Sequence, residues 1–189
     1  MQYLPVRLKQ KFSNIKISSG LISTTLNNFQ PSLTEFQLQR FGGETDGSYL
    51  IPDDLDGIDN CISFGCGSDT KFEDDLGNYI GLNFTIFDEI ANFPLNYEYS
   101  KHSFVSGWIG KFMKPNSSAT PLFALDSAFK HSSEAEFSDA ILKIDIESSE
   151  YTALLAADTE SLERVRILIV EFHKVNEITS SSIFCLMLN

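Results

Sequence analysis

Two glycines and an aspartate are spaced as in proteins that bind a nucleoside. Gly65 and Gly67 flank Cys66 directly after the apolar run of residues 60–64. Asp88 follows about 20 residues later, at the end of a second apolar run. Glycines let the backbone turn tightly and approach a ligand, and a carboxylate at this spacing can accept both hydroxyls of a ribose. We therefore expect these residues to bind an adenosine group.

The same segment does not have the features of a phosphate site. Thr70 occupies the position where dinucleotide-binding loops carry a third glycine, which lets helix and strand pack closely beside a pyrophosphate. The chain also lacks a P-loop lysine motif, and residues 44–89 hold twelve acids against the single cation Lys71. An adenosyl ligand that has a sulfonium charge and no phosphates suits this pattern, which predicts S-adenosylmethionine. An NAD-binding domain is the disfavoured alternative.

Acidic residues and a histidine follow two later apolar runs. Asp145 and Glu147 follow one of them, and Glu171 and His173 follow the last. Such residues can solvate the end of a strand, but a carboxylate or an imidazole can also remove a proton from a substrate. Asp145, Glu171 and His173 could also bind a metal, although their spacing is not diagnostic and we predict none.

Alternating strands and helices are needed to place these residues together. Apolar runs predict strands at residues 60–64, 83–87, 103–109, 141–146 and 165–172, and helical spacing predicts helices at 71–80 and 150–157, with another beginning at 126–129. Asp69 or Thr70 can cap the first of these helices. The alternation indicates an α/β fold with a doubly wound, mainly parallel sheet. Ligands bind beyond the carboxyl ends of such strands, where the candidate residues lie.

The N-terminal part is expected to be separate from this sheet. Residues 1–39 are predicted to form a helical cap whose last helix begins near Pro31 and ends near Arg40. A turn-forming stretch follows at residues 42–48, and residues 49–52 form a short extended segment. The Rossmann-like domain is then residues 40–189.

Composition excludes several classes of protein. The 189 residues carry a formal net charge of −12 and include sixteen phenylalanines, which is consistent with one globular domain. The acidic middle would repel a phosphate backbone, so nucleic acid is not the expected partner. No apolar run approaches ~20 residues, so we expect no membrane span. Three cysteines without paired spacing fit a reducing compartment and predict a cytoplasmic location.

Four successive motifs resemble those of FkbM-like methyltransferases in order and spacing. The most specific is Lys-Ile-Asp-Ile-Glu-x-x-Glu at residues 143–150. The other three lie at residues 40–52, 64–67 and 170–173, and the resemblance runs from about residue 40 to residue 176. It implies a Rossmann-like class I methyltransferase that transfers a methyl group from S-adenosylmethionine to a hydroxyl. The acceptor would be a small molecule or a sugar-like glycan.

The resemblance also implies roles for individual residues. Arg40 would pair with the methionyl carboxylate. Apart from the resemblance, the chemistry of the residues predicts that Phe64 and Trp108 could flank the adenine, although Trp108 fits the core equally well, and that Cys66 contributes its backbone and no thiol chemistry. The same chemistry makes His173 or Asp145 the general base. The expected cofactor-binding residues are Arg40, Gly43, Asp46, Gly47, Tyr49, Phe64, Gly65, Cys66, Gly67 and Asp88.

The chain departs from the family pattern at three places. Ser63 stands where an acid often precedes the glycine loop, and Ser148 stands where the family usually has glycine. Only sixteen residues follow His173, which predicts a sheet without its last two strands. A non-catalytic adenosyl-binding or interaction domain is therefore the alternative function.

Overall fold

A computed structural model describes residues 35–44, 46–89, 101–109, 122–132 and 139–175. The chain divides into two compact units. One spans Thr34–Phe172 and contains every described strand and helix. The other comprises Met1–Leu33 and His173–Asn189, of which only residues 173–175 are described. The predicted N-terminal helical cap thus lies almost wholly outside the described residues.

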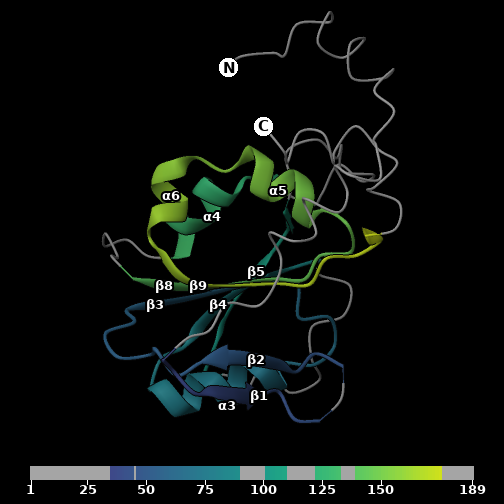
Figure 1. Cartoon of the computed structure of the whole chain (residues 1–189). Coiled ribbons are helices and arrows are strands. Elements are labelled where there is room, and N and C mark those ends of the chain that lie inside the picture. The colour runs from purple at the N-terminus through teal and green to yellow at the C-terminus, as the bar shows by residue number, and fades with distance from the viewer. Residues whose placement is uncertain (1–34, 45, 90–100, 110–121, 133–138, 176–189) are drawn as a thin grey trace, which may run out of the picture. The chain divides into compact units, whose positions relative to one another are not determined.

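A five-stranded sheet forms the centre of the larger unit (Figure 1). Its order is β5-β4-β3-β8-β9, and each neighbouring pair is parallel. Along the chain, β4 and β5 are added on one side of β3, and β8 and β9 are then added on its other side. The strand order therefore reverses between β3 and β8. Ligands bind at such a reversal in open α/β sheets. The strands are β3 (Asn60–Phe64), β4 (Phe84–Asp88), β5 (Ser103–Ser106), β8 (Ala140–Ile144) and β9 (Val165–Val170).

Helices cover both faces of the sheet, as Figure 1 shows. Helix α3 (Lys71–Ile80) lies on one face. On the other face lie α4 (Leu125–Ser132), α5 (Glu150–Ala156) and α6 (Thr159–Glu163). The predicted doubly wound, Rossmann-like α/β fold is therefore confirmed. None of the described helices has the length and apolarity needed to cross a bilayer.

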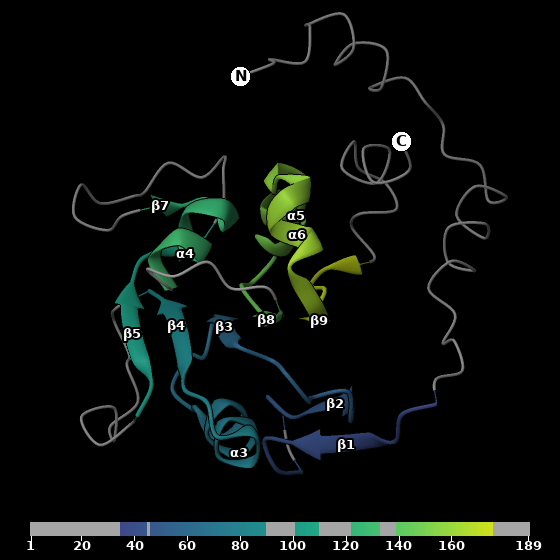
Figure 2. The same ribbon diagram turned by 90° about the vertical axis from the view of Figure 1, so that its left-hand side faces the viewer.

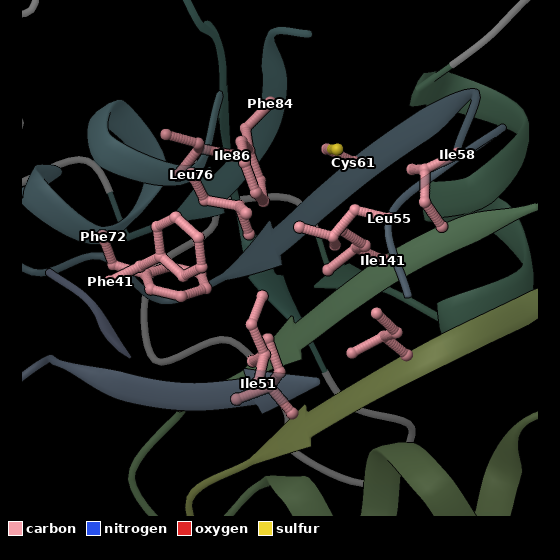
Figure 3. Close-up of a cluster of buried hydrophobic side chains, with 12 residues drawn as sticks. Phe41, Ile51, Leu55, Ile58, Cys61, Phe72, Leu76, Phe84, Ile86 and Ile141 are labelled. Atoms are coloured by element: carbon pink, nitrogen blue, oxygen red, sulfur yellow. The ribbon is translucent and has the colours of Figure 1, made fainter. Parts of the chain in front are cut away.

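Successive side chains of a strand point to opposite faces of the sheet, so the hydrophobic core consists of two clusters, one on each face. Cys61 of β3 and Ile141 of β8 belong to the cluster under α3, which Figure 3 shows together with Phe72 and Leu76 of that helix. The next residues along the chain, Ile62 and Leu142, belong to the opposite cluster. Ser63 and Lys143 come next and are directly paired in register, so they lie on the α3 face.

A β-hairpin lies beside α3 (Figure 2). Strand β1 (Leu38–Phe41) pairs antiparallel with β2 (Tyr49–Pro52). The prediction of a helix ending near Arg40 was therefore wrong, and the strand also crosses the predicted domain boundary at residue 39. Gly42, Gly43 and Gly47 adopt positive φ angles, which turn the chain back so that pairing with β2 overrides the local helical spacing.

The remaining differences from the sequence-based prediction are local. The strand expected at residues 103–109 is interrupted at Gly107, and its second part, β6 (Trp108–Ile109), pairs with β7 (Leu122–Phe123). At the start of α3, Asp69 accepts a hydrogen bond from the Lys71 amide at 2.9 Å, whereas the Thr70 side chain makes no capping bond.

Candidate cofactor site

The glycine loop follows β3 at the reversal point, and its two glycines serve different purposes. Gly65 has φ +82°, and a Cβ there would lie 1.8 Å from the carbonyl oxygen of Asp145. A side chain at this position would therefore collide with the backbone that leaves β8. Gly67 has φ +57°, and a Cβ there would meet nothing within 4 Å. Gly65 lets the two strand ends approach each other, and Gly67 leaves space open beside the loop.

Asp88, at the end of β4, binds this loop directly. Its Oδ2 accepts hydrogen bonds from the backbone N–H groups of Cys66 at 2.7 Å and Gly67 at 2.8 Å. Bonds from amides to a carboxylate are strong and hold both partners in a defined geometry. Both amides converge on Oδ2, so Oδ1 accepts from neither of them. The structure thus brings together the three residues that the sequence paired as a nucleoside site.

The thiol of Cys66 is not set up as a nucleophile. Burial raises its pKa well above the usual range, and the nearby carboxylates of Asp88 and Glu73 raise it further. The reactive form of cysteine is the thiolate, which these surroundings disfavour. The backbone N–H of Cys66 binds Asp88, and a backbone contact of Cys66 with a cofactor stays a prediction.

Tyr49 connects the hairpin to two carboxylates at the ends of neighbouring strands. Its hydroxyl lies 2.9 Å from Oδ2 of Asp145 and 3.1 Å from Oε2 of Glu171. Burial raises the pKa of Tyr49 far above its usual value, and its interactions with Asp145 and Glu171 add to the effect. The hydroxyl therefore stays protonated and donates its one hydrogen between two acceptors. Its ring packs edge-on against Phe72, with the centroids 5.1 Å apart.

A buried lysine lies between the loop and these carboxylates. Lys143 is 3% exposed, and its Nζ donates to the carbonyl oxygen of Gly65 at 2.5 Å. The same Nζ lies 3.4 Å from Oε1 of Glu73 and 3.9 Å from Oδ2 of Asp145. Glu73, which α3 supplies, is 1% exposed and accepts a hydrogen bond from the Ser63 hydroxyl at 2.6 Å.

Sequence reasoning assigned no role to Lys143 or Glu73, and it named Glu171 only as a strand-end acid and as a possible metal ligand. The signal for Lys143 was available, because a lysine inside the apolar run 141–146 must be buried with a partner. The signal for Glu171 was its place directly after the last strand. Nothing in the sequence pointed to Glu73, because its position opposite Lys143 depends on how α3 packs on the sheet.

The profile of the methyltransferase FkbM domain matches residues 57–183. The chain belongs to the FkbM methyltransferase family. Comparison with curated proteins gave no match, and comparison with solved structures gave none either. The matched stretch contains the glycine loop, Asp88, Asp145 and His173. The hairpin lies before it, so site roles for hairpin residues rest on the sequence resemblance and the geometry.

Within this FkbM chain, most of the hairpin residues that were predicted to bind the cofactor do not contact the carboxylates of Asp145 and Glu171. Arg40 is exposed and donates to the Ser48 hydroxyl at 2.8 Å. A Cβ on Gly43 would lie 2.6 Å from Nζ of Lys71, and the exposed Asp46 accepts from the backbone N–H of Gly47 at 3.2 Å. Cofactor contacts for Arg40, Gly43, Asp46 and Gly47 stay predictions. Tyr49 is the one whose side chain reaches Asp145.

Of the two aromatic residues expected to flank the adenine, Phe64 and Trp108, the structure describes the side chain of Phe64 alone. Phe64 is fully buried in the core cluster under α4 and α5 and packs edge-on against Phe87 with a centroid separation of 5.4 Å. A ring in that position does not fit a role beside an accessible adenine, and only the backbone of Phe64 adjoins the loop. The side chain of Trp108 lies outside the described residues.

The two candidate bases belong to different units of the FkbM chain. Asp145 lies in the larger unit, is about a quarter exposed and is held by Tyr49. His173 is the first residue of the other unit after β9. The site therefore consists of residues from the larger unit, and a role for His173 as base stays a prediction.

Proposed function

We propose that this protein is an S-adenosylmethionine-dependent methyltransferase that methylates a hydroxyl of a small-molecule or glycan acceptor. The observation that carries this proposal is the Asp88 carboxylate bound to the loop amides of Cys66 and Gly67. That arrangement lies at the carboxyl edge of the sheet, where the strand order reverses. Oδ1 of Asp88, which neither loop amide binds, would accept the hydroxyls of a ribose, beside the open space at Gly67.

The charges around the loop fit a cationic adenosyl cofactor. Carboxylates of Asp88, Asp145 and Glu171 line this edge of the sheet, and the nearby Lys143 ammonium is buried among Glu73, Asp145 and the Gly65 carbonyl. A pyrophosphate would be repelled by such a set of acids, whereas a sulfonium would be attracted. This favours S-adenosylmethionine over NAD.

The residues of the chain would orient the reactants and accept a proton. When bound, S-adenosylmethionine supplies an electrophilic methyl group. Transfer requires the acceptor oxygen to lie in line with the bond that breaks, which the glycine loop and Asp88 would ensure by fixing the nucleoside. The carboxylate of Asp145, oriented by the Tyr49 hydroxyl at 2.9 Å, would take the proton from the acceptor hydroxyl. His173 is the alternative base.

Titration calorimetry with S-adenosylhomocysteine tests the proposal. We expect the intact protein to bind it and Asp88→Ala to bind at least about tenfold more weakly, because the ribose contact and the loop geometry are lost together. Asp53→Ala, which removes an exposed acid after β2, should bind like the parent chain. Absence of binding by the intact protein would overturn the proposal. Binding without methyl transfer to any hydroxyl acceptor would instead favour a non-catalytic adenosyl-binding domain.

A cytoplasmic location belongs to the same proposal. Both described cysteines, Cys61 and Cys66, are free thiols. Burial raises the pKa of Cys61 to about 12, with a smaller contribution from Asp59. Free, protonated thiols suit a reducing compartment. Localisation of the tagged full chain by fractionation tests this expectation.

A further inference from the structure

The larger unit buries the ammonium of Lys143. It is 3% exposed and lies near the carboxyl end of β8, in register with Ser63 of the neighbouring strand. Burying a cation is costly unless it is paired and hydrogen-bonded. Glu73, 3.4 Å away and itself fixed by Ser63, supplies that pairing. An apolar residue at position 143 would avoid the cost altogether, so the pairing alone does not explain the lysine.

The other contacts of Lys143 point toward the proposed site. Its Nζ donates to the carbonyl oxygen of Gly65, the first residue of the glycine loop, at 2.5 Å. It also lies 3.9 Å from Oδ2 of Asp145, the oxygen that the Tyr49 hydroxyl approaches, and 5.5 Å from the centroid of the Tyr49 ring. One ammonium thus contacts the loop that would hold the nucleoside and the carboxylate that would accept the proton.

We propose that Lys143 is a positioning residue that holds the Gly65 loop and the Asp145 carboxylate in a fixed relation, with Glu73 as its counter-ion. This inference rests on the proposed function. Lys143 acts through its two neighbours and touches neither reactant. The Ser63 hydroxyl keeps Glu73 oriented toward the ammonium, which gives a structural reason for serine at this position before the loop.

The decisive variant removes the charges as a pair. Lys143→Met combined with Glu73→Gln leaves no unpaired ion in the core, and the glutamine can still accept from Ser63. We expect its thermal unfolding midpoint to stay within a few degrees of the parent, because a neutral pair replaces a buried ion pair. We expect its affinity for S-adenosylhomocysteine to fall at least about tenfold, because the loop carbonyl and Asp145 lose their shared anchor. Lys130→Met, at an exposed lysine of α4, is the matched control and should change neither quantity.

A second measurement needs no cofactor. Amide hydrogen exchange at Cys66 and Gly67, whose N–H groups bind Asp88, should be faster in the paired variant than in the parent. Parent-like affinity together with parent-like exchange in a folded paired variant would overturn the proposal. If the parent itself fails to bind S-adenosylhomocysteine, the proposed function falls, and the exchange rates still report whether Lys143 holds the loop.

Glu73→Gln alone provides the remaining test should the paired variant not fold. It keeps the ammonium on Gly65 and Asp145 and removes only the counter-ion. We expect a lower unfolding midpoint but an affinity within about threefold of the parent. A tenfold loss of affinity in this variant would assign the effect to Glu73 and overturn the role of Lys143.

Discussion

Ser148 adopts a backbone conformation that suits glycine. Its φ is +79°, a region where a side chain is strained, and its buried hydroxyl has no hydrogen-bond partner among the described residues. Ser148→Gly removes both penalties, although it also gives the unfolded chain more freedom. We expect a net gain of about 1 kcal/mol in the free energy of unfolding, measured by urea denaturation.

The matched control for this substitution is Ser127→Gly. Ser127 is an exposed residue of α4, where the backbone is helical. Glycine there should lower the free energy of unfolding by about 0.5 kcal/mol, because it has a lower helix propensity than serine. Equal effects at both positions would show that the positive φ at Ser148 is not a source of strain.

The Tyr49 hydroxyl should contribute measurably to the free energy of unfolding, because it donates its hydrogen to two carboxylates. Tyr49→Phe keeps the ring contact with Phe72 and removes the hydrogen bond to Asp145 and Glu171. We expect a loss of about 1.5 kcal/mol, the usual scale for a hydrogen bond to a charged group. Tyr79→Phe, which removes an exposed hydroxyl bound only by Gln39 in the described structure, should cost less than about 0.5 kcal/mol. Equal losses in calorimetric unfolding would contradict this assignment.

Individual site residues could be predicted where the reason was local. The sequence predicted that Gly65, Gly67 and Asp88 would meet, because all three adjoin strands that run parallel and end at one edge. It did not predict the contact of Lys143 with Gly65. That contact requires knowing that β8 lies directly beside β3, which follows only from the order of strands in the sheet.

At the scale of elements, the short helix α6 depends on its first residue. Asp158 precedes the helix, and its carboxylate accepts from the backbone N–H of Ser161 at 2.6 Å. That hydrogen bond lowers the pKa of Asp158 below its usual 3.8. Because the folded-state pKa is depressed, the stabilisation is fully present above about pH 4 and is lost as the pH falls through the folded value.

Two substitutions test this cap. Asp158→Ala should cost about 1 kcal/mol at pH 7, and its deficit relative to the parent should shrink as the pH falls below 3.8. Asp158→Asn keeps an acceptor that does not titrate, so it should lose less at pH 7, and its deficit should shrink over the same pH range because only the parent has a carboxylate to protonate. Urea denaturation between pH 7 and pH 3 gives both quantities. A deficit for alanine that does not change with pH would show that the carboxylate does not act through its charge.

The elements themselves were predicted best where sequence periodicity and turn residues agree. The bounds of β2, β3 and α3 match the predicted ranges, because each is an apolar pattern that proline, glycine or a polar cap ends. Strand β1 was missed because its spacing also fits a helix, and only its pairing with β2 decides between the two. Such pairing depends on residues further along the chain, so local patterns could not reveal it.

At the scale of the whole larger unit, Arg166 joins segments that are distant in the sequence. It lies on β9, and its guanidinium binds both carboxylate oxygens of Asp139, which precedes β8. It also donates to the carbonyl oxygens of Asp54 at 3.4 Å and Asp56 at 2.6 Å, in the segment between the hairpin and β3. The hydrogen bond to Asp139 raises the pKa of Arg166, which favours the charged guanidinium.

Arg166→Met and Arg166→Lys separate the effect of the charge from the effect of the hydrogen-bond geometry of the guanidinium. Because the Arg166 side chain is 25% exposed, solvent screens its ion pair, and the hydrogen bonds to two segments should matter more than the charge. A lysine keeps the charge but cannot bind Asp139 with two parallel bonds while reaching the carbonyls of Asp54 and Asp56. We therefore expect Arg166→Met to lose about 2 kcal/mol in urea denaturation and Arg166→Lys to lose more than about half of that amount. Full recovery by lysine would mean that charge alone ties the hairpin segment to the edge of the sheet.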